Sequence, residues 1–152
     1  MAGSSLHRSF AHIVFSTKYR IDWIDDDIEE ALFAYLGKMC LVKKYEPIKI
    51  GGYRDHVHLL VRQPKVSIGA SELLETVKKQ SSKWMKLQDE RYADFRWQIG
   101  YAYFSVDPDR IDGLVQYITN QRIHHQKKGY KKELLQILDR YRCEYDERYL
   151  WD

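Results

Sequence analysis

The chain has 152 residues, and its 25 Lys and Arg residues against 22 Asp and Glu residues give a formal net charge of +3. Hydrophobic residues make up 44% of the sequence and charged residues 31%, a balance that is typical of a folded protein and excludes a disordered chain. No apolar run reaches the roughly 18 residues of a membrane-spanning helix, which excludes a transmembrane protein. The first ten residues lack the apolar stretch of a secretory signal, and Cys40 and Cys143 have no metal-ligand spacing. We therefore expect a cytoplasmic protein without membrane contact.

The hydrophobic pattern predicts the order strand, helix, strand, strand, helix, strand, followed by two further helices. In the first helix, early acidic residues favour the N-terminus and are followed by an apolar stripe. A tight turn at Arg54 and Asp55 joins the second and third strands. The expected ranges of the first six elements are 9–17, 22–44, 47–53, 56–62, 71–91 and 97–106.

Asp107 as N-cap and Pro108 as first residue predict a third helix that runs to about residue 127 and ends at Gly129. A fourth helix is expected over 131–142. The order of the first six elements is that of the α+β, ferredoxin-like or RRM-like βαββαβ fold, with one antiparallel sheet and two helices on one of its faces. That fold serves many functions, so function must be argued from the sites.

We expect residues 1–152 to form a single domain. Its parts are a flexible tail (1–8), the ferredoxin-like core (9–106), a tyrosine-bearing helix (107–128) and a C-terminal helix with a tail (129–152).

His56 and His58 stand in an otherwise apolar strand, separated by Val57. Side chains alternate across a strand, so both imidazoles share one face, about 7 Å apart. There they can converge on one cation or, if protonated, on one phosphate. The simpler alternative is one histidine packed in the core and one on the surface. A polar pair in an apolar strand costs free energy unless a partner satisfies it, which favours a ligand.

Tyr117 begins a polar stripe on the third predicted helix, with Gln121 four residues later and His124 and His125 beyond it. Alone, Tyr117 is an ordinary amphipathic helix residue and Gln121 a surface amide. The two histidines can be extra ligands, phosphate contacts or exposed residues, and we favour the last two. If the stripe meets the histidine strand, a metal held by His56, His58 and the Gln121 amide oxygen can orient a phosphate for attack by Tyr117.

In this order and with their flanking residues, these motifs resemble the single-tyrosine HUH transposases of the insertion-sequence 200/605 group, known as TnpA. The resemblance covers nearly the whole chain. The segments that carry it are 12–20, 51–61, 81–84, 97–101 with 104–106, and 117–121 with His124 and His125.

The resemblance implies that His56, His58 and Gln121 hold a divalent metal, Mg²⁺ or Mn²⁺. It also implies that Tyr117 is the nucleophile, which cleaves single-stranded DNA, forms a 5′-phosphotyrosine and releases a 3′-hydroxyl. Family members recognise imperfect hairpins at transposon ends and act as homodimers, commonly with the histidine pair of one subunit completed by the tyrosine helix of the other. Imidazoles are softer ligands than Mg²⁺ usually receives, so Mn²⁺ suits the site chemically.

Basic residues on the helices are candidate contacts to DNA phosphates, although a solvated helix face is the simpler alternative for each of them. They are Lys78, Lys79, Lys83 and Lys86 on the second helix, Arg122 on the third, and Lys127, Lys128, Lys131 and Lys132 towards the end. Trp97, Tyr101 and Tyr103 can stack on bases, with core or dimer packing as the simpler explanation.

Two alternative functions remain open at this point. One is a related HUH nuclease that processes chromosomal repeat hairpins or replication origins. The other is a non-catalytic RRM-like nucleic-acid-binding module, which would need exposed aromatic residues on the central strands. His56 and His58 in that position argue against the second alternative.

Overall fold

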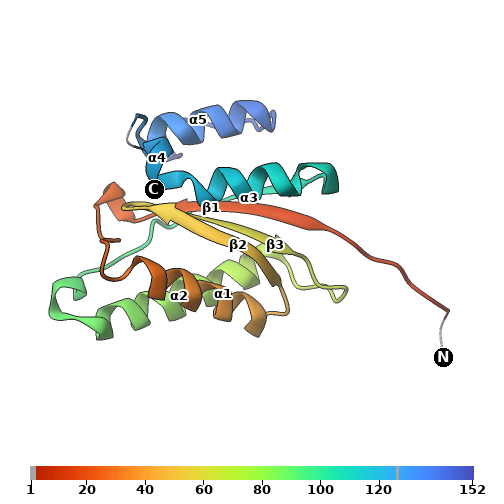
Figure 1. Ribbon diagram of the computed structural model, residues 1–152, viewed down its shortest axis with the longest axis horizontal. Coiled ribbons are helices and arrows are strands. Elements are labelled where there is room, and N and C mark those ends of the chain that lie inside the picture. The colour runs from red at the N-terminus through yellow and green to blue at the C-terminus, as the bar shows by residue number, and fades with distance from the viewer. Residues whose placement is uncertain (1–2, 126) are drawn as a thin grey trace.

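The computed structural model describes residues 3–125 and 127–152. They form a four-stranded antiparallel sheet with helices on both of its faces. The strands β1 (Phe10–Ser16), β2 (Glu46–Tyr53), β3 (His56–Arg62) and β4 (Ala102–Val106) lie in the order β2-β3-β1-β4. Helices α1 (Glu29–Val42) and α2 (Ala70–Gln88) cover one face, and α3 (Ile111–Thr119), α4 (Gln121–His125) and α5 (Tyr130–Arg140) cover the other (Figure 1). The predicted α+β, ferredoxin-like fold is confirmed. Of the predicted tail, residues 1 and 2 lie outside the described residues.

The central strands β1 and β3 are buried on both sides because each face of the sheet carries its own apolar layer. Alternate residues of the two strands pack against α1 and α2, whereas the others face α3 and α5. The second set includes His12, His56 and His58, all at most 1% exposed. The sheet face that an RRM-like module would offer to bases is therefore covered by helices (Figure 1).

The prediction of one continuous helix from residue 107 to residue 127 is wrong. A 3-10 turn precedes α3, which ends at Thr119, and α4 begins at Gln121. Asn120 terminates α3, and its backbone N–H donates to the carbonyls of Gln116 and Ile118. Gly129 does not end this helix but precedes α5 as its N-cap, with extended backbone angles.

Two predicted elements begin several residues later than expected. The helix expected over 22–44 is regular only from Glu29, after a turn, and the strand expected over 97–106 pairs regularly only from Ala102. Before that point Thr17 and Trp97 form an isolated bridge, and the backbone N–H of Gln98 donates to the carbonyl of Ser16 at 2.9 Å. The side chain of Gln98 adds to this pairing, because its Oε1 accepts the backbone N–H of Ser16 at 2.7 Å. Among the described residues, no helix is both long and apolar enough to cross a membrane.

Gly51 brings α3 directly onto the backbone of β2. A Cβ at this position would lie 2.8 Å from Cγ2 of Ile118 and 2.9 Å from its carbonyl oxygen, so glycine alone permits this approach. Gly51 is paired with His58 across β2 and β3. The helix that carries Tyr117 is consequently seated beside the histidine strand.

Candidate active site

The two histidines of β3 lie on the face covered by α3, α4 and α5. His56 and His58 are fully buried, and their ring centroids are 5.1 Å apart. The ring of Tyr117 lies edge-on to His58 at a centroid distance of 5.7 Å. The structure therefore brings the predicted nucleophile to the histidine pair within one chain.

Glu133 of α5, which the sequence analysis missed, lies at the centre of this group and is 1% exposed. Its Oε1 atom faces three imidazole nitrogens. Nε2 of His56 and Nε2 of His58 are each 3.2 Å away, and Nε2 of His125 is 3.0 Å away. One carboxylate oxygen thus lies close to all three histidines.

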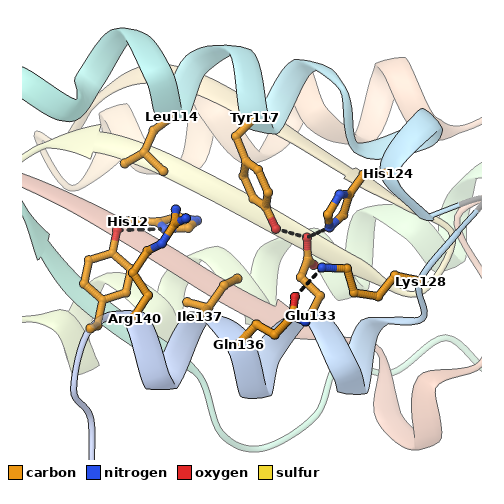
Figure 2. Close-up of a pocket in the computed structure, with 10 residues that line it drawn as sticks. His12, Leu114, Tyr117, His124, Lys128, Glu133, Gln136, Ile137 and Arg140 are labelled. Carbon is orange, nitrogen blue, oxygen red and sulfur yellow. Dashed lines mark hydrogen bonds and ion pairs between the residues drawn. The ribbon is translucent and has the colours of Figure 1, made fainter.

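The second oxygen of Glu133 faces the polar stripe that begins at Tyr117. Oε2 accepts hydrogen bonds from the hydroxyl of Tyr117 and from Nε2 of Gln121, the latter at 3.0 Å, and lies 3.4 Å from Nε2 of His124. Figure 2 shows Tyr117 of α3 and Glu133 of α5 pointing toward each other, with His124 beside them. The amide oxygen of Gln121 accepts from His56, with 2.7 Å between Oε1 and Nε2. The stripe therefore meets the histidine strand despite the break at Asn120.

Polar neighbours hold both histidines in place from behind. Nδ1 of His56 lies 2.8 Å from Oδ1 of Asp55, and Nδ1 of His58 lies 2.9 Å from Nε2 of His12. His12 in turn lies 3.4 Å from the hydroxyl of Tyr141. When Nδ1 of His58 carries its proton, as His12 favours, Nε2 of His58 offers its lone pair to the centre of the site. Nε2 of His56 donates to Gln121 and must lose that proton before it can do the same. Such outer partners are typical of metal-binding histidines.

Burial and charge act against each other in this cluster. Burial lowers the pKa of His56, but hydrogen bonds with Asp55 and Glu133 outweigh it and raise the pKa to about 9. Burial lowers the pKa of His58. For Glu133, burial opposes ionisation, but the imidazoles, led by His58, hold its pKa well below the usual range. Burial, with the nearby charge of Glu133, raises the pKa of the Tyr117 phenol. The cluster thus combines an ionised carboxylate with a protonated phenol.

The donor set fits a divalent metal. Ligand atoms of His56, His125 and Glu133 all lie within 4.8 Å of one another. Within residues 3–125 and 127–152, the buried Nε2 atoms of His124 and His125 have no partner in hydrogen-bond geometry. Their side chains are only 27% and 4% exposed, so of the two favoured interpretations the exposed surface residue is wrong, and contact with a phosphate stays a prediction. A histidine nitrogen that binds a metal needs no hydrogen-bond partner from the protein. Buried, unpartnered nitrogens beside a carboxylate are therefore typical of a metal site.

A cavity of about 340 Å³ opens between α3 and α5, next to the phenol of Tyr117 (Figure 2). Two cationic side chains, Lys128 and Arg140, line it together with His12 and Glu133. The cavity is therefore large enough, and suitably charged, to receive a phosphate group at the phenol oxygen.

The candidate DNA contacts do not form one surface. Lys79 and Lys83 are exposed on α2, on the face of the sheet opposite Tyr117 (Figure 1). Arg122 is exposed but already paired, at 2.7 Å from Asp26 and 3.2 Å from Glu29.

Lys78 donates to the carbonyls of Gln98, Ile99 and Gly100, the first at 2.9 Å and the second at 3.1 Å, and burial lowers its pKa to about 8. Lys127 is exposed, and Lys128 donates to Gln136 at the cavity. Of the candidates, Lys128 lines the cavity beside Tyr117, and Lys131 and Lys132 are exposed on α5, on the same face of the sheet.

The three candidate stacking residues also differ. Trp97 is 8% exposed and packs against Phe15, and its indole N–H donates to Ser81 at 2.9 Å. Tyr103 is half-buried at the apolar core, whereas Tyr101 is 39% exposed. Core packing therefore explains Trp97 and Tyr103.

A sequence signal for Glu133 does exist. It is the one acidic residue on the buried stripe of α5, whose other members are apolar or aromatic (Tyr130, Leu134, Ile137 and Leu138). His12 gives a similar signal, as a polar residue within the apolar strand β1. An ionisable side chain on an otherwise apolar stripe requires a buried partner.

Comparison with known proteins matches residues 5–121 to the family described as IS200-like transposase. The fold is similar to that of a candidate transposase from Deinococcus radiodurans R1, with a TM-score of 0.61, 21% identity, and coverage of 80% of this chain and 96% of that one. It is also similar to a REP-associated tyrosine transposase bound to a REP hairpin, with a TM-score of 0.59, 15% identity, and coverage of 82% and 74%. At these low identities, the TM-scores show a shared fold. No curated protein matches the sequence.

Proposed function

Because the chain belongs to the IS200-like transposase family, we propose that it cleaves and rejoins single-stranded DNA through a covalent bond to Tyr117. One observation carries this proposal. The hydroxyl of Tyr117 and the imidazoles of His56 and His58 meet at the same buried carboxylate, so the nucleophile and the metal-binding pair occupy one site. A family member that only bound DNA would not need a tyrosine hydroxyl that lines a cavity beside a buried histidine pair.

The chemistry assigned to Tyr117 is an exchange of one phosphodiester bond for another. The phenol loses its proton, its oxygen attacks phosphorus, and the bond to the 3′-oxygen breaks. That oxygen takes up a proton, and the 5′ end remains on the tyrosine. Reversal by a 3′-hydroxyl rejoins a strand without ATP, because no phosphodiester is lost.

The residues around Tyr117 have separate roles in this proposal. His56, His58 and Gln121 hold the divalent metal, which supplies Lewis-acid stabilisation of the phosphate when it is bound. Glu133 accepts the hydrogen bond of the Tyr117 hydroxyl and so fixes the direction of the phenol oxygen. Lys128, at the mouth of the cavity, is placed to contact the phosphate.

Single-stranded DNA with a hairpin beside the cleavage site is the proposed substrate. A transposase of similar fold is bound to a hairpin in its solved structure. The homodimer remains a prediction that sedimentation would test. Since one chain assembles Tyr117 with its own His58, a site shared between subunits is not required for this geometry.

The proposal is tested with hairpin-bearing single-stranded DNA from the ends of the native element and from chromosomal repeats. Wild-type protein with Mn²⁺ should give a covalent adduct on a denaturing gel, and EDTA or Tyr117→Phe should abolish it. Tyr149→Phe is the matched control, because Tyr149 is 69% exposed and does not line the cavity, and it should leave the adduct unchanged. Hairpin binding without any adduct would contradict the proposal. Cleavage of the element ends would indicate transposition, whereas cleavage of the chromosomal repeats would indicate repeat processing.

A further inference from the structure

The proposed metal site of this chain extends beyond the segment that matches the family. That segment ends at residue 121, whereas His125 ends α4 and Glu133 lies on α5. We propose that His125 and Glu133 are metal ligands, so that three imidazoles, a carboxylate and an amide oxygen hold the ion and select Mn²⁺ over Mg²⁺. The inference rests on the proposed function in that His56, His58 and Gln121 supply the other three ligand atoms.

The two oxygens of Glu133 face different parts of the site. Oε1 faces the imidazoles at 3.0 to 3.2 Å, whereas Oε2 faces the hydroxyl of Tyr117 and the amide of Gln121. Neighbouring ligand atoms around an octahedral ion with bonds of about 2.1 Å are about 3 Å apart. Oε1 already has this spacing from Nε2 of His56, His58 and His125. Of the three imidazoles in the described residues, only His56 and His125 form with Glu133 a group whose ligand atoms all lie within 4.8 Å of one another, so His58 must move towards the ion when it binds. Glu133 can therefore hold the ion through one oxygen while the other positions Tyr117.

His125 completes the same side of the site. Its ring lies 4.4 Å from that of His56, edge-on, and its side chain is 4% exposed. Nε2 of His125 is 3.0 Å from Oε1 of Glu133 but has no partner in hydrogen-bond geometry within the described chain. A buried nitrogen without a partner is costly, and a metal ion would satisfy it.

His124 has a different position, although its sequence neighbour is a proposed ligand. Its Nε2 lies 3.4 Å from Oε2, on the side of Glu133 that faces Tyr117, and its ring lies 5.2 Å from the tyrosine ring. His124 is therefore placed at the nucleophile and is not part of the proposed ligand set.

The proposed ligands favour one class of ion. Mg²⁺ prefers oxygen ligands and keeps several waters, whereas imidazole suits transition metals. With three imidazoles and two oxygen ligands, few positions remain for water. The ligand set therefore predicts a preference for Mn²⁺, stronger than a single histidine pair would give.

The test measures metal binding directly on the full-length protein, without DNA. Electron–nuclear double resonance on bound Mn²⁺ should detect three imidazole nitrogens, and His125→Gln should reduce the number to two. Calorimetry should show Mn²⁺ affinity at least tenfold weaker in His125→Gln and in Glu133→Gln. The matched controls are His7→Gln, an exposed histidine outside the site, and Asp139→Asn, an exposed acid on α5, and both should bind like wild type. Mg²⁺ in 100-fold excess should not displace the Mn²⁺.

Two nitrogens in the wild-type spectrum, or unchanged affinity in both site variants, would overturn the inference. So would tighter Mn²⁺ binding or faster DNA cleavage in Glu133→Gln, because the carboxylate would then only block the site. The wild-type nitrogen count decides the matter even if a variant does not fold. Three imidazole nitrogens on Mn²⁺ but no covalent DNA adduct would refute the proposed function and support the ligand set. A covalent adduct with only two imidazole nitrogens on Mn²⁺ would support the proposed function and refute the ligand set.

Discussion

Gly51→Ala should test whether the contact between α3 and β2 sets the position of Tyr117. The added Cβ would meet the Ile118 carbonyl oxygen at 2.9 Å, and ordinary contact begins at 3.4 Å. The methyl group of Ile118 can rotate away, but its carbonyl belongs to the helix, so α3 must retreat by about 0.5 Å. Overpacking of this kind costs about 1–3 kcal/mol of folding free energy.

Tyr117 is the residue before Ile118 and must move with it. A misplacement of about 1 Å can cost about 100-fold in rate, so half that distance predicts cleavage about tenfold slower. The measurements are urea unfolding and single-turnover cleavage of hairpin DNA. Gly113→Ala on the same helix is the matched control, since a Cβ there has nothing within 4 Å. It should stabilise the protein by about 0.5–1 kcal/mol and leave the rate unchanged. Wild-type stability and rate in Gly51→Ala would refute the reasoning.

Two further predictions concern residues around the site and the charged surface. His12→Phe removes the acceptor behind His58 while keeping an aromatic ring, so Mn²⁺ affinity measured by calorimetry should fall about 10- to 100-fold; unchanged affinity would show that His12 does not orient His58. Lys78→Met leaves three carbonyls without their donor and should lower the free energy of unfolding by about 1–3 kcal/mol without changing the salt dependence of DNA binding. Lys127→Ala should leave stability unchanged but reduce the slope of log K for DNA binding against log salt concentration by about 1. Equal slopes in the two variants would contradict a phosphate contact by Lys127.

The strands and the first contacts of the site were predictable because they depend on local pattern. Alternation in β1 and β3 places His56 and His58 on one face, and helical spacing places Tyr117 and Gln121 on one stripe. The pattern does not say on which face of the sheet α5 packs, so the meeting of Glu133 with the histidines was missed. Lys78 reads as an exposed helix lysine, but its long side chain reaches carbonyls of the loop before β4.

The break at Asn120 shows the limit of local signals in a different way. In the sequence 107–127 the one proline is Pro108, at the start, and the one glycine is Gly113, which lies within α3. Neither residue explains why the helix ends at Thr119. The helix nevertheless ends at Thr119, and α4 carries Gln121 to His56 and His125 to Glu133. Buried polar contacts between segments distant in the sequence accompany this break, and the sequence pattern does not report them.

Mass spectrometry of the covalent adduct tests the central claim most directly. The chain contains 12 tyrosines, so the attachment site must be identified and not inferred from the loss of activity in a variant. After the wild-type protein reacts with hairpin single-stranded DNA and Mn²⁺, nuclease and protease digestion should leave a nucleotide joined through its 5′-phosphate to Tyr117. Attachment to Tyr130, to any other tyrosine or through a 3′-phosphate would contradict the account.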